Sequence, residues 1–415
     1  MKISCFSLLH LWNFSLIFNS IFIIIPYQGM HTYTIFSIPL GYMLFIITFL
    51  FIIIFNKFRI EKINSLIRYS IYGILFYCMF SVLIVKNYRS WFIYLVMWVF
   101  YVLSFLSLIR IYNRHICLKN FITYLKNIIF TFSIISLIGI FRFLFLKFGD
   151  ANPWAFINKN GYIFSIVPFI PIILAAIDYG MYKTFKFLII FIIIFINIIL
   201  VFSRTAYIGL VFSLFMYYII YHIVNFYRIN LLSLLRRILR FLLVTILLYI
   251  LMINIPHFKE KIIIGFETVN KVIKFGEIKE GESDYRRYLL IKESIRIFKE
   301  HWLLGTGLGL ENYLYYFNEN TIPAKPHSLY LSYLAEFGLI GFSFLVLFLF
   351  SILQVLYKTI LYTIGKKEVY LSIGFFVGHL TILIMFLFNE YITAPYTWFF
   401  WATAVAYSLL VRKER

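Results

Sequence analysis

Long apolar runs most constrain what this 415-residue chain can fold into. Residues 187–202 read FLIIFIIIFINIILVF without a charged residue, and with their flanks such runs approach the roughly 20 residues that cross a hydrocarbon core. Because the backbone inside lipid must satisfy its own hydrogen bonds, these spans are expected to be helices. Apolar residues make up 63% of the chain and charged residues only 13%, which excludes an ordinary soluble domain. The sequence therefore predicts an all-α, polytopic helical membrane protein.

Twelve apolar segments are candidate membrane spans, and an even number places both termini on one side of the membrane. The predicted spans are residues 4–25, 35–55, 66–85, 91–109, 127–146, 161–179, 187–202, 206–224, 238–255, 331–357, 369–388 and 394–411.

Basic residues are distributed unevenly between the loops on the two sides of these spans. One set of loops, together with both termini, carries 21 Lys and Arg residues, whereas the other set carries six outside the polar segment 256–327. This asymmetry predicts cytoplasmic termini in a cytoplasmic (inner) membrane, because short cytoplasmic loops are enriched in Lys and Arg. The net charge of +21 therefore reflects topology, and we expect no nucleic-acid binding.

Residues 256–327 form a polar segment between two groups of apolar spans. The segment holds 10 of the 17 acidic residues and 11 of the 38 Lys and Arg residues, and it is too long for a simple connector. It separates residues 1–255, a bundle of spans one to nine, from residues 328–415, which hold spans ten to twelve. Long translocated segments are exempt from the charge rule, so the alternation of the short loops places this segment on the extracytoplasmic side. We expect the chemistry of the protein to occur there.

Arg204 interrupts two apolar spans that would otherwise run continuously from Phe187 to Tyr221. A lone arginine at this depth can be an interface anchor, but ionisable groups bounded by apolar spans are functional candidates. The guanidinium keeps its proton and matches phosphate oxygens with a planar fork of donors. The turn Ser203-Arg204-Thr205 is predicted to face the same side as residues 256–327, where Arg204 suits an anionic lipid-linked substrate.

Residues 284–302 are predicted to form an amphipathic helix. The apolar side chains recur at spacings of three and four, and they are Tyr288, Ile291, Ile295, Phe298 and Trp302. Charged residues such as Glu293 and Arg296 lie off that face, as expected for a helix on the membrane surface. The tandem Arg286-Arg287 in the first turn fits that simple interpretation less well, because cations are disfavoured at the positive end of a helix. A bound anion would reverse that cost.

His327 is the natural general base of this region, because its ordinary pKa lies near neutrality. His257 and His301 are interpreted as structural, and neither they nor the cysteines at positions 5, 78 and 117 form a metal-site pattern with His327. The run Gly305-Thr306-Gly307-Leu308-Gly309 lacks the preceding strand and the Lys-Ser or Lys-Thr of a phosphate loop. It is predicted to be a tight turn that lets the backbone pass close to lipid or sugar.

Four patches resemble the O-antigen polymerase and ligase superfamily of integral membrane glycan transferases. They are residues 156–161 (FINKNG); Ser203-Arg204-Thr205; Arg287 followed by Gly305-x-Gly307-x-Gly309; and His327-Ser328-x-Tyr330-Leu331 followed by Glu336-x-Gly338-x-x-Gly341. The chain departs from the family pattern at Ser328, where the histidine is commonly followed by Asn, and in its doubled arginine. The spacing to Gly305 favours Arg287 over Arg286 as the matching residue.

The resemblance implies a glycosyltransferase that takes an oligosaccharide from an undecaprenyl diphosphate carrier and uses no cofactor or obligatory metal. Arg204 and Arg287 would hold the diphosphate, and His327 would take the proton of the attacking sugar hydroxyl. The substrate-binding residues would be Arg286, Asn160, Ser203, Glu336 and Tyr330. Expected partners are the lipid-linked oligosaccharide, membrane lipids and other polysaccharide-assembly membrane proteins.

Three functions remain open on the sequence. A polymerase of O-antigen, capsule or exopolysaccharide extends the repeat-unit chain and needs no specialised acceptor, so we favour it over a ligase that hands the chain to a lipid A core or protein. A transporter of the same lipid-linked glycans would place ionisable groups along a path at bilayer depth. The candidates within spans are few and lie mostly near span ends, namely Arg142, His222, Glu336, His379 and Glu390.

Overall fold

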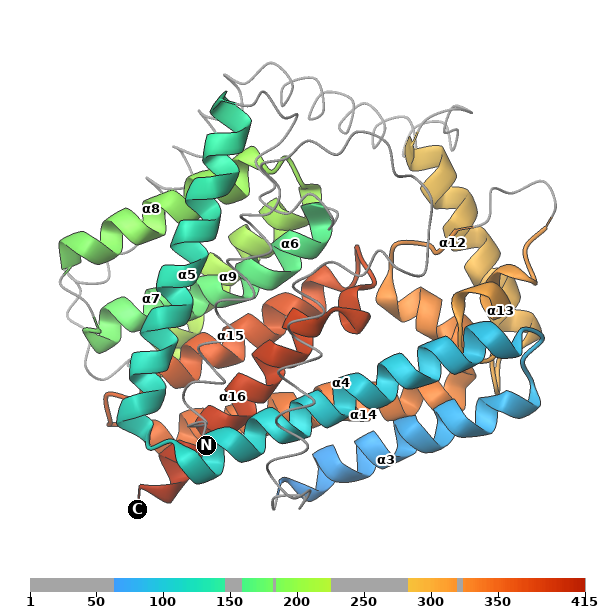
Figure 1. The fold of residues 1–415 in the computed structure, drawn as a ribbon, viewed down its shortest axis with the longest axis horizontal. Coiled ribbons are helices and arrows are strands. Elements are labelled where there is room, and N and C mark those ends of the chain that lie inside the picture. Colours follow the sequence, from blue (N-terminus) through green and yellow to red (C-terminus); the bar gives the residue numbers. More distant parts are fainter. Residues whose placement is uncertain (1–62, 146–158, 182–183, 225–282, 319–323, 415) are drawn as a thin grey trace, which may run out of the picture.

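A computed structural model of the chain describes residues 63–145, 159–181, 184–224, 283–318 and 324–414. Every regular element in these ranges is helical (Figure 1). The elements are α3 (Ser65–Phe80), η2 (Ser81–Leu83), α4 (Tyr88–His115), α5 (Leu118–Phe145), α6 (Lys159–Ile166), η3 (Val167–Phe169), α7 (Ile170–Tyr179), α8 (Thr184–Leu200), α9 (Arg204–Val224), α12 (Ser283–Glu300), α13 (Leu310–Leu314), α14 (Leu329–Thr363), α15 (Val369–Met385), η5 (Tyr391–Thr393) and α16 (Pro395–Lys413).

The helices confirm the prediction of an all-α polytopic membrane protein. Six helical segments in the described ranges are long and apolar enough to cross a membrane, and α15 is a shorter apolar helix. Each predicted span between residues 66 and 224, and each between 331 and 411, coincides with helical structure. The predicted spans 4–25, 35–55 and 238–255 lie outside the described residues, as do the first 27 residues of the polar segment, 256–282.

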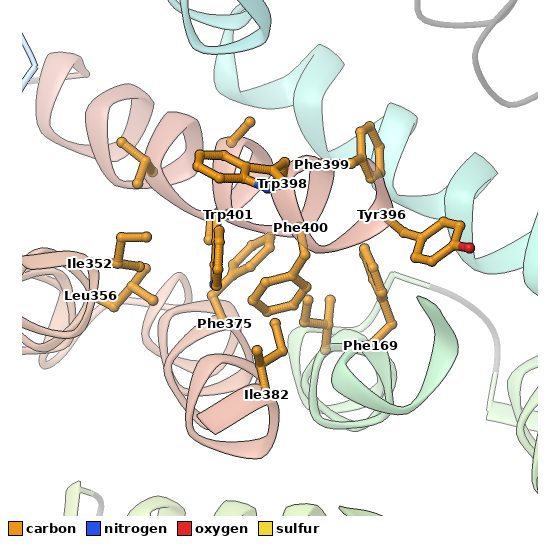
Figure 2. Close-up of a cluster of buried hydrophobic side chains, with 14 of the residues drawn as sticks. Phe169, Ile352, Leu356, Phe375, Ile382, Tyr396, Trp398, Phe399, Phe400 and Trp401 are labelled. Carbon is orange, nitrogen blue, oxygen red and sulfur yellow. The ribbon is translucent and has the colours of Figure 1, made fainter. Parts of the chain in front are cut away.

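The core of the bundle is aromatic and lies where α16 meets α4, α14 and α15. Figure 2 shows Phe400 of α16 directed toward α15 and η3, where its ring lies 6.2 Å from that of Phe375 and 5.3 Å from that of Phe169, centroid to centroid. The Trp398 ring lies 5.4 Å from Trp401 and 5.8 Å from Trp98 of α4, centroid to centroid. Because lipid tails are as apolar as these side chains, the helices are held together by close van der Waals packing rather than by a hydrophobic drive.

The two ends of the bundle correspond to the two sets of loops defined by the charge pattern. Lys413 Nζ donates to Asn113 O at 2.6 Å, and Lys367 Nζ lies 4.9 Å above the ring of Tyr179, so loops of the basic set meet at one end. At the other end of α15 and α16, Asn389 Nδ2 donates to Thr205 Oγ1 at 2.8 Å. The packing therefore agrees with the predicted grouping of the loops.

Helix α14 is broken at Gly338, where φ is 58° and ψ is −170°. A break at membrane depth frees backbone groups that must find new partners, and the segment around the Gly305–Gly309 run supplies them. The hydrogen bonds are Thr306 N to Ala335 O (3.0 Å), Gly307 N to Glu336 O (2.9 Å), Leu339 N to Trp302 O (2.8 Å) and Ile340 N to Leu303 O (3.2 Å). The glycine run thus passes close to the protein's own backbone, and its approach to lipid or sugar stays a prediction.

The predicted amphipathic helix exists as α12 (Ser283–Glu300), and a face other than its apolar stripe packs against the protein. Leu290, Glu293 and Ile297 are buried, whereas the predicted apolar residues Tyr288 and Ile295 are 49% and 40% exposed. The expectation that Glu293 is solvated is wrong, because Arg296 Nη2 reaches its carboxylate at 2.5 Å and Asn318 N donates to it at 3.0 Å. These polar contacts fix α12 to the following chain and leave its apolar stripe free to face lipid.

Candidate active site

The loop between α15 and α16, residues 386–394, is the meeting point of the candidate site. Glu390 Oε1 accepts a hydrogen bond from His327 N at 3.1 Å. The neighbouring Asn389 donates to Thr205 at the start of α9, and Phe386 O accepts from Leu329 N at 2.9 Å. One short loop therefore joins two of the motif patches, which lie more than a hundred residues apart in the sequence.

The turn between α8 and α9 is bound to the start of α6. Ser203 Oγ donates to Asn160 Oδ1 at 2.7 Å, and Lys159 Nζ donates to Phe202 O at 3.3 Å. The structure thus places two predicted substrate-binding residues, Asn160 and Ser203, in direct contact. Their hydrogen bond fixes the turn from which Arg204 begins the next helix.

Backbone strain occurs on both sides of this site. Phe202 (φ 51°) and His327 (φ 55°) are the two residues other than glycine with positive φ in the part of the chain that the structure describes. For side-chain-bearing residues this conformation costs on the order of 1–3 kcal/mol, and such residues cluster at functional sites. One strained residue immediately precedes the Ser203-Arg204-Thr205 patch and the other begins the His327 patch, which supports the assignment of this region as the site.

Arg204 is the first residue of α9, and its side chain is exposed. The start of a helix carries a partial positive charge and unpaired backbone N–H groups. A guanidinium at the same position adds to that field, so this end of α9 favours an anionic ligand such as a phosphate.

His327 lies between Pro326 and the first residues of α14, and its side chain is exposed. Its backbone N–H is held by Glu390. Tyr330, the second residue of α14, donates its hydroxyl to Leu383 O at 2.8 Å. That hydroxyl therefore fixes α14 to α15, and only its remaining acceptor capacity is available to a substrate.

Three charged residues form an acidic–lysine triad (Lys325, Glu336 and Glu390) beside His327. Lys325 Nζ forms an ion pair with Glu336 Oε1 and lies 3.6 Å from Glu390 Oε2. Its ammonium also lies 5.7 Å and 5.5 Å from the ring centroids of Tyr94 and Tyr333. Glu336 is 1% exposed, so this predicted substrate-binding carboxylate faces a cation of its own chain.

The triad shifts the acid–base behaviour of its members. Burial raises the pKa of Glu390 to about 7, with a further increase from Glu336 and an opposing effect of Lys325. Burial lowers the pKa of Lys325, but the two carboxylates raise it more, so the pKa lies well above its ordinary value. Lys325 is therefore charged throughout the physiological range, whereas Glu390 titrates within it.

Arg287 is exposed on α12. Within the described ranges, no hydrogen bond or ion pair joins Arg287 to His327 or Arg204. Figure 1 shows α12 on the right of the view and α6 and α9 on the left. The side chain of Arg286 lies outside what the structure describes. The structure thus brings Asn160, Ser203 and the His327 segment into one hydrogen-bonded region, and in the part of the chain that it describes Arg287 is not hydrogen-bonded to His327 or Arg204.

Sequence reasoning missed Lys325, Asn389 and Tyr94 as neighbours of the site. It noted Glu390 only as an ionisable residue near a span end. That position could have identified Glu390 as a candidate site residue, because acidic residues bounded by apolar spans are energetically unfavourable in the membrane and usually have a function.

Comparison with known families identifies the class of protein. Residues 189–346 match a family model described as O-antigen ligase. The match includes Arg204, Arg287, His327 and Glu336 and ends before Glu390. No curated protein sequence matches the chain. The matched family consists of glycosyltransferase-like ligases and polymerases that act on lipid-linked glycans in membranes. This match, which spans less than half of the chain, supports the assignment of this multi-pass membrane protein to the O-antigen polymerase and ligase superfamily.

Proposed function

We propose that this protein is a polymerase of cell-surface polysaccharide, such as O-antigen, capsule or exopolysaccharide. It transfers a glycan from an undecaprenyl diphosphate carrier to a sugar hydroxyl of another lipid-linked repeat unit. The observation that carries this proposal is the hydrogen-bonded connection of His327, through Glu390 and Asn389, to the turn that carries Ser203 and Arg204. A base and an anion-binding helix start are then parts of one structural unit.

The site is proposed to face the extracytoplasmic side of the cytoplasmic membrane, with both termini in the cytoplasm. The support is the excess of Lys and Arg in the opposite set of loops, 21 against six. Lipid-linked repeat units presented in the outer leaflet would then reach Arg204 from the membrane.

In the proposed reaction His327 takes the proton of the acceptor hydroxyl, and that oxygen forms a bond to the anomeric carbon of the donor glycan. The bond between the anomeric carbon and the diphosphate oxygen breaks, and the electron pair leaves with the diphosphate. Arg204 stabilises the charge that develops there. Arg287 is proposed as the second cation, and Arg286 as an additional contact to the donor. Most of the rate gain comes from holding donor and acceptor in line.

The exposed face of α12 supports this role for Arg287. Tyr288, Ile295 and Trp302 are 40–53% exposed, which suits a helix whose apolar side lies in the membrane interface. A helix in that position holds a nearby arginine at the depth of lipid headgroups, where a lipid-linked diphosphate lies.

A ligase is the second candidate, because the matching family model carries that description. Purified protein in liposomes with undecaprenyl-diphosphate repeat units separates the possibilities. A ladder of products supports the polymerase, and transfer only to added core lipid supports the ligase. Translocation of unchanged donor would indicate a carrier and contradict both.

Alanine variants test the residues. Arg204→Ala, Arg287→Ala and His327→Ala should abolish long glycan chains while the protein remains in the membrane. Two exposed cations, Arg89 at the start of α4 and Lys292 on α12, provide matched controls whose removal should leave chain length unchanged. Full-length polymer from all three site variants would refute the assignment of the site.

A further inference from the structure

The position of Glu390 suggests a role that the family match does not include, since that match ends at residue 346. We propose that Glu390 is a positioning residue: together with Lys325 and Glu336 it fixes the backbone of residues 324–328 and so orients the side chain of His327. This inference rests on the proposed function of His327 as the general base.

His327 needs such support because its backbone is strained. Its φ of 55° lies in the left-handed region, which side-chain-bearing residues adopt only when their surroundings enforce it. The residue is also outside the regular hydrogen bonding of α14, which begins at Leu329. An external acceptor for its N–H is therefore required to hold this conformation, and Glu390 Oε1 provides it at 3.1 Å.

Glu390 is itself held by charge. Its second oxygen, Oε2, lies 3.6 Å from Lys325 Nζ. One carboxylate therefore contacts the side chain of Lys325 and the backbone of His327. The carboxylate thereby fixes two points of a five-residue segment. A carboxylate that contacts two points restricts both the position and the rotation of the peptide between them.

Glu336 extends this network to the break in α14. Lys325 forms an ion pair with its buried carboxylate, and the carbonyl of Glu336 accepts from Gly307 N at 2.9 Å and from Tyr77 Oη at 3.1 Å. The triad therefore connects His327 to the helix break at Gly338. Buried charges of this kind are a poor source of stability but can specify one arrangement of the chain, which is what an oriented base requires.

Two substitutions separate the hydrogen bond from the charge. Glu390→Gln keeps an oxygen acceptor for His327 N and removes the ionic contact with Lys325, whereas Glu390→Leu removes both. The matched control is Glu368→Leu, the same substitution at the opposite end of α15. The full-length protein is assayed in liposomes with an undecaprenyl-diphosphate repeat unit, and kcat and KM are reported per folded molecule.

We expect Glu390→Leu to lower kcat about 100-fold with little change in KM, because a misplacement of about 1 Å at a reacting group has that effect. Glu390→Gln should retain most of the turnover, and Glu368→Leu should match the wild type. A wild-type kcat for folded Glu390→Leu would overturn the proposal, as would equal losses in the Gln and Leu variants.

Amide hydrogen exchange gives a readout that does not depend on the reaction. The peptide that contains His327 N should exchange faster in Glu390→Leu than in Glu390→Gln, while peptides from α16 remain unchanged. Equal exchange in the two variants would overturn the positioning role even if the proposed function holds. Conversely, full activity of His327→Ala with faster exchange in Glu390→Leu would refute the catalytic role of His327 and leave the backbone contact intact.

Discussion

Gly338→Ala should destabilise the protein strongly, because the break in α14 accepts no side chain at this position. The backbone conformation, φ 58° and ψ −170°, belongs to a region that is essentially restricted to glycine. A Cβ at Gly338 would lie 2.5 Å from Leu303 O and closer still to Gly305 N. Both atoms belong to backbone, which cannot rotate away as a flexible side chain can.

The magnitude follows from the strain and from the hydrogen bonds at the break. The backbone conformation alone costs a residue with a Cβ about 2 kcal/mol. Four backbone hydrogen bonds join residues 302–307 to α14 on either side of Gly338, and each contributes about 1 kcal/mol net to the free energy of unfolding. If the added Cβ breaks two of them, the loss in free energy of unfolding is about 4 kcal/mol.

Denaturant titration of the purified protein in mixed micelles measures this loss. Gly180→Ala is the matched control, because Gly180 also has a positive φ of 75° but its Cβ would meet only Lys367 Nζ at 3.6 Å. The control should lose about 1 kcal/mol from the left-handed backbone alone. Equal destabilisation of the two variants would refute the argument that close packing of Gly338 against residues 303–305 holds the break.

Three further perturbations test the charges and hydrogen bonds around the site. The pKa of Glu390 in the folded protein, about 7, lies above its ordinary value of 4.5. As pH rises, the unfolded chain therefore loses this proton before the folded protein does. The free energy of unfolding should fall by about 3 kcal/mol between about pH 4.5 and about pH 7. Lys325 stays charged over that pH range, so Glu390→Gln should remove this decrease in the free energy of unfolding, measured between pH 4.5 and 8. If the unfolding free energies of the two proteins change in parallel with pH, the raised pKa is contradicted. Ser203→Ala removes the hydroxyl that holds Asn160 and should cost about 1 kcal/mol and lower turnover in the liposome assay, whereas Ser213→Ala, within α9, should leave turnover unchanged. Arg296→Met leaves the buried carboxylate of Glu293 without its cation and should cost about 1–3 kcal/mol in a thermal unfolding comparison with Lys299→Met, the exposed control; similar losses in both would indicate that the pair is not needed.

The helical membrane class and most helix positions could be predicted from the sequence, because membrane insertion depends on the local apolarity of some 20 consecutive residues. Residues 161–179 show the limit of that signal. They form one predicted span, but Pro168 and Pro171 divide it into α6, η3 and α7. The hydropathy of the run is unaffected by prolines that interrupt its hydrogen bonding.

The role of the Gly305–Gly309 run could not be predicted, because its partner lies about 30 residues further along the chain. Three glycines with positive φ indicate a tight turn, which the sequence correctly suggested. Only the fold shows that this turn satisfies the free backbone groups of a broken helix. The apolar face of α12 is a similar case, because its spacing predicts a helix but not which side contacts protein.

The sequence by itself determined the membrane helices, the grouping of loops by charge and the motif residues Arg204, Arg287 and His327, since each is a property of a short stretch of chain. The tertiary structure alone decided that Glu390 contacts His327, that Asn389 contacts Thr205, and that Glu336 faces Lys325. Those contacts arise because α15 and α16 pack against helices formed by distant parts of the chain, and pairing between distant residues is fixed by how helix surfaces fit together. The candidate site is thus a set of locally encoded residues held in place by a loop whose importance appears only after the helices are assembled.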